Sequence, residues 1–205
     1  LLRRALPAEA TIHEVATRTS KKLFATSKLS RIFAVAQAPR AAGLRDLATL
    51  QQDIVVLENL GISGNIGAII RTAVALGVGG VVLLDSDTEV YDRRLIRASR
   101  GQVFSLPVVK ATQEELLAFC RQHGWKLLVT DPQASYLVHD IASLQGRLAI
   151  VFGNEKKGCS GALLKAASLQ IKIPTDPLVE SLNVSAAAAI TLFHRSKSNL
   201  CPLAP

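Results

Sequence analysis

The chain has 205 residues, of which 49% are hydrophobic and 20% are charged, a composition typical of a globular protein rather than a disordered or fibrous one. That length suffices for one substantial domain with a smaller appendage. Lysine and arginine exceed aspartate and glutamate by eight, so the surface attracts polyanions, and nucleic acid is the leading candidate partner. The positive charge alone fits an anionic membrane surface, or a need for solubility, as well.

The sequence gives little support for a membrane span, a secretion signal or a metal site. No apolar run approaches the ~20 residues that a membrane span requires, and residues 1–7 lack the apolar stretch of a secretory signal, so we expect a cytoplasmic protein without a membrane partner. Cys120, Cys159 and Cys201 lie far apart without CxxC spacing, so we expect neither disulfides nor a bound metal. The absence of methionine suggests that the sequence begins inside a longer product.

The first forty-odd residues differ from the rest. They are rich in basic side chains and end in a linker-like segment, residues 38–43. A segment of this size seldom folds alone, so residues 1–42 are interpreted as the remnant of a domain or as an arm on the main body, residues 43–205.

From residue 55 onward, short apolar runs alternate with segments of helical spacing. Ile66, Ile69, Ile70, Ala73 and Leu76 predict one helix, and Thr112 followed by Glu115 predicts the start of another. The pattern favours an α/β fold with a mostly parallel sheet and helices on both faces. The predicted buried strands are 55–57, 81–84, 127–129, 148–152 and 171–173.

Glycines gather where predicted strands end, which suits either plain turns or loops that approach a small molecule. Gly61, Gly64 and Gly67 are spaced G-x-x-G-x-x-G, which fails the dinucleotide fingerprint. Residues 153–158 resemble the start of a phosphate-binding loop, but Cys159 stands where that loop requires lysine. No G-x-S-x-G sequence supports a hydrolase.

Three segments follow one another along the chain: Gly64-Asn65-Ile66-Gly67-Ala68-Ile69-Ile70-Arg71, Phe152-Gly153-Asn154-Glu155, and Ile173-Pro174 followed by Glu180-Ser181-Leu182-Asn183-Val184-Ser185. Together they resemble the signature motifs of the TrmH branch of the SPOUT methyltransferases. They occur in the family's order and cover residues 53–194. The resemblance implies an enzyme that transfers a methyl group from S-adenosylmethionine to a ribose 2′-hydroxyl of RNA.

Residues 97–109 and 85–87 further resemble the thiostrepton- and nosiheptide-resistance members, which methylate an adenosine ribose in 23S rRNA. In that subgroup a ribosomal-protein-like RNA-binding domain precedes the catalytic one, and residues 1–42 resemble its tail. Two alternatives stay open: a housekeeping 2′-O-methyltransferase acting on tRNA or another rRNA site, and a non-catalytic RNA-binding or assembly factor.

The resemblance also implies a C-terminal trefoil knot and a homodimer, neither of which the sequence pattern itself predicts. It implies that S-adenosylmethionine is held mainly by backbone groups of the knot loops. The matching positions are Thr130, Gly153, Ile173 and Leu182, with Arg100 as a candidate for the cofactor carboxylate or an RNA phosphate. The sequence departs from the family at residues 175–177, which lack the apolar residue usual after Ile-Pro.

The catalytic positions that the resemblance implies are Asn65, Arg71, Glu155, Asn183 and Ser185. The family nominates the arginine to activate the hydroxyl. A guanidinium group has a pKa above ~12 and is a poor base, so our hypothesis is that Arg71 chiefly binds a phosphate and stabilises the developing alkoxide. Asn183 and Ser185 also suit a helix cap before residue 186.

Basic side chains supply the candidate RNA contacts. Arg93, Arg97 and Arg100 would form one stripe if their segment is helical, although the stripe by itself favours a solvated surface face. With the resemblance we predict RNA contact. The full set is Arg71, Arg93, Arg97, Arg100, Lys21, Lys22 and Lys28.

Overall fold

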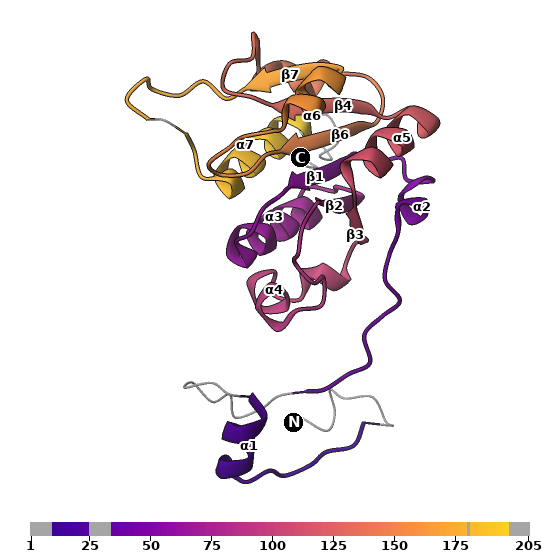
Figure 1. Ribbon diagram of the computed structural model, residues 1–205, viewed down its shortest axis with the longest axis vertical. Coiled ribbons are helices and arrows are strands. Elements are labelled where there is room, and N and C mark those ends of the chain that lie inside the picture. Colours follow the sequence, from indigo (N-terminus) through magenta and orange to yellow (C-terminus); the bar gives the residue numbers. More distant parts are fainter. Residues whose placement is uncertain (1–9, 25–33, 180, 197–205) are drawn as a thin grey trace, which may run out of the picture. The chain divides into compact units, whose positions relative to one another are not determined.

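The computed structural model describes residues 10–24, 34–179 and 181–196. The chain divides into two compact units, residues 1–38 and 39–205 (Figure 1). The described part of the first unit contains one helix, α1 (Thr17–Phe24). The division falls in the segment for which the sequence predicts a linker, and the assignment of residues 1–42 to an RNA-binding domain stays a prediction.

The described part of the second unit is built on a sheet of seven strands that all run parallel. Their spatial order is β3-β2-β1-β6-β4-β7-β5, which confirms the predicted mostly parallel sheet. The strands are β1 (Ile54–Glu58), β2 (Gly80–Leu84), β3 (Val108–Ala111), β4 (Lys126–Thr130), β5 (Tyr136–Leu137), β6 (Leu148–Phe152) and β7 (Leu169–Lys172).

The central strands are buried from end to end, because helices cover both faces of the sheet. Val55 of β1 lies between Val81 of β2 and Ile150 of β6. Successive side chains of a strand point to opposite faces. Val55 therefore packs in one hydrophobic core and its neighbour Val56 packs in the other.

The helices separate into two sets, one for each core, which confirms the predicted two-sided arrangement. The first core receives α3 (Ser63–Ala75), α4 (Arg93–Ala98) and α7 (Val184–Ser196). The second receives α2 (Leu44–Leu47), α5 (Gln113–His123) and α6 (Gly161–Ala166). In the described part of this unit there are also two 3₁₀ turns, η2 (Gln102–Phe104) and η3 (Val138–Ser143). No helix in the described ranges is long and apolar enough to cross a membrane.

The start of α5 follows the predicted capping box. The hydroxyl of Thr112 accepts a hydrogen bond from the Glu115 amide at 3.2 Å, and the Glu115 carboxylate accepts one from the Thr112 amide at 2.8 Å. The helix ends at Gly124, whose φ of 69° suits glycine. Strands β3 and β5 were not predicted, because two to four residues beside a loop carry too short a pattern.

A buried ion pair fastens α7 to the sheet. Nε of Arg195 lies 2.6 Å from Oδ2 of Asp53, and both side chains are only 12% exposed. The Asp53 carboxylate also accepts the amide of Leu148 at 2.8 Å, while the guanidinium donates to carbonyls of Ile141, Leu144 and Gly146. One arginine thus connects the C-terminal helix to the beginnings of β1 and β6 and to η3.

Replacing Asp53 by alanine should lower the free energy of unfolding by about 3–5 kcal/mol, because it leaves a buried guanidinium without its counter-ion. Urea denaturation measures the change. Lys110→Ala is the matched control, since it removes the exposed ion pair with Glu89 at 2.8 Å and should cost at most about 1 kcal/mol. Equal losses in the two variants would contradict a structural role for the buried pair.

Candidate active site

Several of the predicted site residues lie where four adjacent strands end. Strands β1, β6, β4 and β7 are neighbours in the sheet and point the same way, so the segments that follow them meet at one edge. Open α/β sheets bind ligands at this edge, at the point where the strand order reverses. Here the order reverses between β1 and β6, since β2 and β3 continue to one side and β4 and β7 to the other.

A chain of hydrogen bonds joins all three motif segments at that edge. Nδ2 of Asn65 donates to Oε1 of Glu155 at 2.8 Å, and Oδ1 of Asn65 accepts from Nδ2 of Asn183 at 3.2 Å. Oδ1 of Asn183 in turn accepts from the Ser185 hydroxyl at 2.6 Å. The structure therefore brings together four of the five predicted catalytic residues, from segments about 30 to 120 residues apart.

Two helix ends present this network. Asn65 lies in the first turn of α3, and Asn183 directly precedes α7. Oδ1 of Asn183 accepts the backbone amide of Ser185 at 2.9 Å, which is the bond of a helix cap. Asn183 can therefore cap α7 and belong to the site at the same time, because its amide oxygen accepts a hydrogen bond within α7 while its amide nitrogen donates one to Asn65.

The second motif forms a closed turn after β6. The amide of Asn154 donates to the carbonyl of Gly158 at 3.1 Å, and the amide of Gly158 returns the bond at 2.9 Å. A Cβ on Gly153 would overlap the backbone of Gly158 and Cys159, so this position requires glycine. Glu155, which is half-buried, projects from the turn to its bond with Asn65.

Asn154 holds the turn in place, a structural role that was not predicted from the sequence. Its Oδ1 accepts the amides of Lys156 and Lys157 at 3.0 and 3.2 Å, and its Nδ2 donates to the Asn59 carbonyl after β1 at 2.9 Å. The sequence does contain a signal for this role, because asparagine favours turns in which its side chain accepts a hydrogen bond from the amide two residues ahead.

Thr130 and Cys159 form neutral hydrogen bonds to backbone carbonyls near the ends of β4 and β6. The Thr130 hydroxyl donates to the carbonyl of Val151 at 2.9 Å, and the thiol of Cys159 lies 3.6 Å from the carbonyl of Thr130. Burial, with the nearby carboxylates of Glu58 and Asp131, raises the pKa of the Cys159 thiol to about 12. Cys159 is therefore protonated at neutral pH and is no candidate nucleophile.

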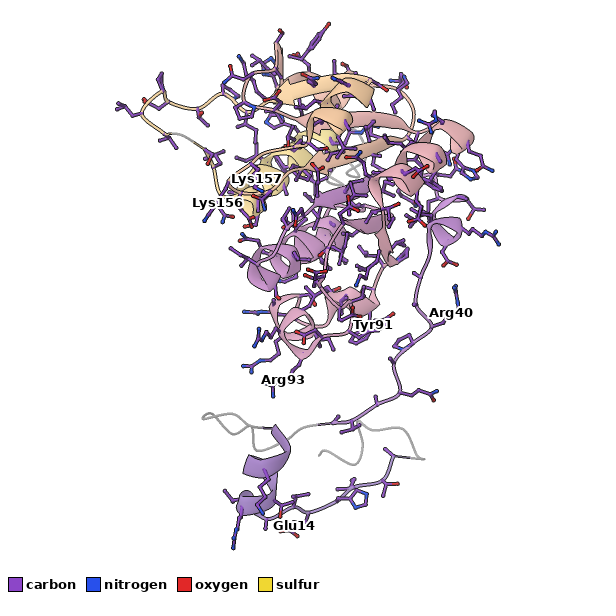
Figure 2. The ribbon with its side chains drawn as sticks, in the orientation of Figure 1. Glu14, Arg40, Tyr91, Arg93, Lys156 and Lys157 are labelled. Carbon is purple, nitrogen blue, oxygen red and sulfur yellow. The ribbon has the colours of Figure 1, made fainter. Side chains whose placement is uncertain are left out.

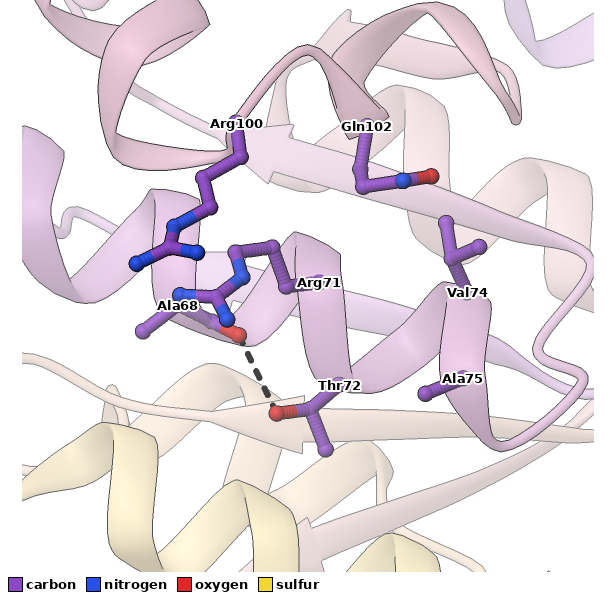
Figure 3. A pocket seen from close by; sticks show the side chains of 7 residues that line it. All are labelled: Ala68, Arg71, Thr72, Val74, Ala75, Arg100 and Gln102. Carbon is purple, nitrogen blue, oxygen red and sulfur yellow. Dashed lines mark hydrogen bonds between the residues drawn. The ribbon is translucent and has the colours of Figure 1, made fainter.

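Arg71 lies apart from the network, roughly 9 Å farther along the axis of α3 than Asn65 at 1.5 Å per residue. It lines a depression of about 620 Å³ with Arg100 and Gln102, and Figure 3 shows the side chains of both arginines at this depression. Both arginines are exposed. Such a pair suits a phosphate group.

The position of Arg100 differs from the predicted helical stripe. Helix α4 ends at Ala98, and Arg100 follows it with a φ of 51°, so only Arg93 and Arg97 share the helix. Gly67 permits this arrangement, since a Cβ there would lie 2.5 Å from that of Ala98. The end of α4 thereby packs against α3, which brings Arg100 to Arg71.

The remaining predicted contacts are dispersed. Ile173 follows β7 and Leu182 precedes α7, and both are half-buried. Lys22 is exposed on α1, which also contains Lys21, whereas Lys28 lies outside the described residues. Among the residues that the structure describes, no cluster of histidine, cysteine and carboxylate side chains could hold a metal ion.

Comparison with known proteins places this arrangement in a family. A model described as the SpoU rRNA Methylase family matches residues 52–193. The chain belongs to the SpoU rRNA methylase family. A second model, described as the N terminus of thiostrepton-resistance methylase, matches residues 2–50.

Two curated relatives of this SpoU-family chain come from Streptomyces. Each is named 23S rRNA (adenosine(1067)-2′-O)-methyltransferase. The S. laurentii protein is 44% identical over 182 residues, which are 88% of this chain and 67% of the relative. The S. azureus protein is 44% identical over 180 residues, which are 87% of this chain and 67% of the relative.

Solved structures of similar fold include an AdoMet-bound rRNA methyltransferase from Sinorhizobium meliloti. It has a TM-score of 0.74 and 29% identity, and the match covers 79% of this chain and 62% of that one. The SpoU methyltransferase AviRb from Streptomyces viridochromogenes, in complex with AdoMet, has a TM-score of 0.68 and 30% identity, covering 74% of this chain and 62% of that one. The chain thus spans about two thirds of the length of these relatives.

Replacing Gly153 by alanine should lower the free energy of unfolding by about 1–3 kcal/mol, because the added methyl group forces the 158–159 backbone to shift. Thermal or urea unfolding measures the loss. Gly161→Ala is the matched control, since its Cβ meets nothing within 4 Å at the start of α6. Full stability of the Gly153 variant would show that the turn is not tightly packed.

Proposed function

We propose that this SpoU-family chain transfers a methyl group from S-adenosylmethionine to a ribose 2′-hydroxyl of RNA, and that its substrate is an adenosine in 23S rRNA. The observation that carries the proposal is the hydrogen-bonded network of Asn65, Glu155, Asn183 and Ser185, which unites the three motif segments at the edge where open sheets bind ligands. The names of the two Streptomyces relatives support the choice of RNA.

The residues at this edge fit S-adenosylmethionine. Thr130 ends β4, Gly153 follows β6 and Ile173 follows β7, so their backbone groups lie on three neighbouring strands. Ile173 and Leu182 are both half-buried and apolar, as suits residues that contact the adenine ring of the cofactor. When bound, the cofactor supplies a methyl group on a positively charged sulfur. AdoMet is also the ligand that two of the structural neighbours are described as binding.

Positioning is the main contribution that the protein residues make to this reaction, because the hydroxyl oxygen must approach the methyl carbon in line. Asn65 is held at both ends of its amide, by Glu155 and by Asn183, and therefore presents a fixed edge to the substrate. In our proposal Arg71 and Arg100 bind the phosphate beside the reacting ribose and stabilise the negative charge that develops on its oxygen.

The finer architecture is also part of the proposal. We infer a C-terminal trefoil knot and a homodimer, as in the TrmH branch that the motifs resemble. Residues 173–183 lead from β7 to α7, and Asn183 bonds to Asn65 of α3, so the segment before α7 contacts the first motif. On α7, Phe193 is 48% exposed, as suits a side chain that a second subunit covers.

The housekeeping alternative rests on relatives of lower identity. A 23S rRNA (guanosine(2553)-2′-O)-methyltransferase from Bacillus subtilis is 32% identical over 148 residues. The match of residues 2–50 to the thiostrepton-resistance N terminus favours the adenosine substrate over this one. The non-catalytic alternative conflicts with the complete network.

Transfer of labelled methyl groups to 23S rRNA fragments tests the function directly, and calorimetry tests cofactor binding. We expect micromolar binding of S-adenosylmethionine and incorporation at one adenosine, located by mapping ribose methylation. Asn65→Ala should reduce transfer by at least about tenfold, because it releases both Glu155 and Asn183. A folded protein that binds no S-adenosylmethionine would contradict the proposed enzyme.

Arg71→Lys should retain the positive charge but lose the two-pronged contact with phosphate. We expect kcat/KM for RNA to fall about tenfold to a hundredfold, while the affinity for S-adenosylmethionine stays unchanged. Steady-state kinetics across a range of pH gives both values for the wild type and the variant. Full activity of the lysine variant would rule out a two-pronged phosphate contact.

A further inference from the structure

The turn that carries Glu155 also carries two lysines to which no role has been assigned. We propose that Lys156 and Lys157 bind the RNA backbone beside the reaction site, as a second phosphate contact in addition to the Arg71–Arg100 depression. This inference rests on the proposed function, since it names how the same substrate is held.

The turn presents the lysines in a fixed geometry. Their backbone amides both donate to Oδ1 of Asn154, while paired backbone bonds between Asn154 and Gly158 close the turn. Nδ2 of Asn154 ties the turn to the carbonyl of Asn59, at the end of β1. Because the backbone is already ordered, a ligand that binds the lysines restricts only their side chains.

The side chains of the turn point in two directions. Glu155 is half-buried and bonds to Asn65, whereas Lys156 and Lys157 are exposed (Figure 2). At 3.8 Å per residue, the Cα atoms of the two lysines lie within about 4 and 8 Å of that of Glu155. The positive charges are therefore close to the catalytic network without taking part in it.

These charges are available for a polyanion. Within the described ranges, neither lysine forms a salt bridge, and the carboxylate nearest in sequence, Glu155, is bonded to Asn65. The chain as a whole carries a net charge of +8. Phosphate groups recur along an RNA strand, so a basic pair at this position binds the backbone without reading the base.

Two separate contacts would align the ribose. The lysine turn and the Arg71–Arg100 depression both adjoin α3, since the side chain of Asn65 in its first turn bonds to Glu155 and Arg71 follows Asn65 by six residues. A strand held at both places has its 2′-hydroxyl fixed relative to the network. Such alignment lowers the entropic cost of reaching the transition state.

The test compares the full chain with the double variant Lys156→Gln/Lys157→Gln. The backbone amides that build the turn are retained, so the variant should fold normally. We expect the Kd for a 23S rRNA fragment, measured by fluorescence anisotropy without cofactor, to rise about tenfold. The slope of log Kd against log salt should fall by about one to two units, since each phosphate contact contributes roughly 0.7–0.9.

Three controls separate this role from a general effect of charge or folding. Lys165→Gln removes one exposed lysine of α6 and should leave both measurements within about twofold of the wild type. Lys156→Arg/Lys157→Arg should retain RNA affinity. Binding of S-adenosylmethionine should be the same in all variants.

An unchanged RNA affinity and salt slope in the glutamine variant, with methyl transfer intact, would overturn this proposal and leave the proposed function standing. Loss of RNA affinity in the glutamine variant alone supports the lysine contact. A wild-type chain that binds RNA but neither binds S-adenosylmethionine nor transfers methyl groups would contradict the proposed function instead.

Discussion

The amide of Asn65 connects segments that the chain places far apart. Its nitrogen donates to Glu155 and its oxygen accepts from Asn183, so one planar group fixes the loop after β6 and the start of α7 relative to α3. An amide has one donor side and one acceptor side, which allows it to satisfy a carboxylate and a second amide at once. A carboxylate or a hydrocarbon at this position could not bond to both neighbours.

The sheet makes this connection possible. Because β1 and β6 are parallel neighbours, with Leu57 opposite Phe152, the segments that follow them emerge at the same edge. The buried pair of Arg195 and Asp53 secures the opposite end of α7. Helix α7 is thus fixed at both ends, by an ion pair near its C-terminus and by the Asn65 network at its N-terminus.

Much of this arrangement could be predicted from the sequence. The buried runs of β1, β2 and β6 and the capping box of α5 are local patterns, and each was recognisable without tertiary contacts. The four residues of the network were identified because the segments that contain them resemble the motifs of the family. Spacing along the chain alone would not have paired Asn65 with Glu155, since 90 residues separate them.

Features that depend on packing could not be predicted. The sequence predicted one helical stripe that includes Arg100, but α4 ends at Ala98. Arg100 adopts a left-handed conformation that its neighbours in sequence do not dictate. The partnership of Asp53 with Arg195 joins the beginning and the end of the second unit, and no motif marks either residue. Asn154 was visible as part of a motif, but its bond to Asn59 depends on the neighbouring strand.

The double use of Asn183 has a thermodynamic consequence. Its side chain caps α7 through one atom and orients Asn65 through another, so unwinding the first turn of the helix also releases the network. Fraying of the first turn of α7 and disassembly of the network are therefore the same opening reaction. A ligand that binds only the assembled site should slow hydrogen exchange of the amides in that turn. Hydrogen exchange at the start of α7 would thus report whether a ligand occupies the site around Asn65, more than 100 residues away in the sequence.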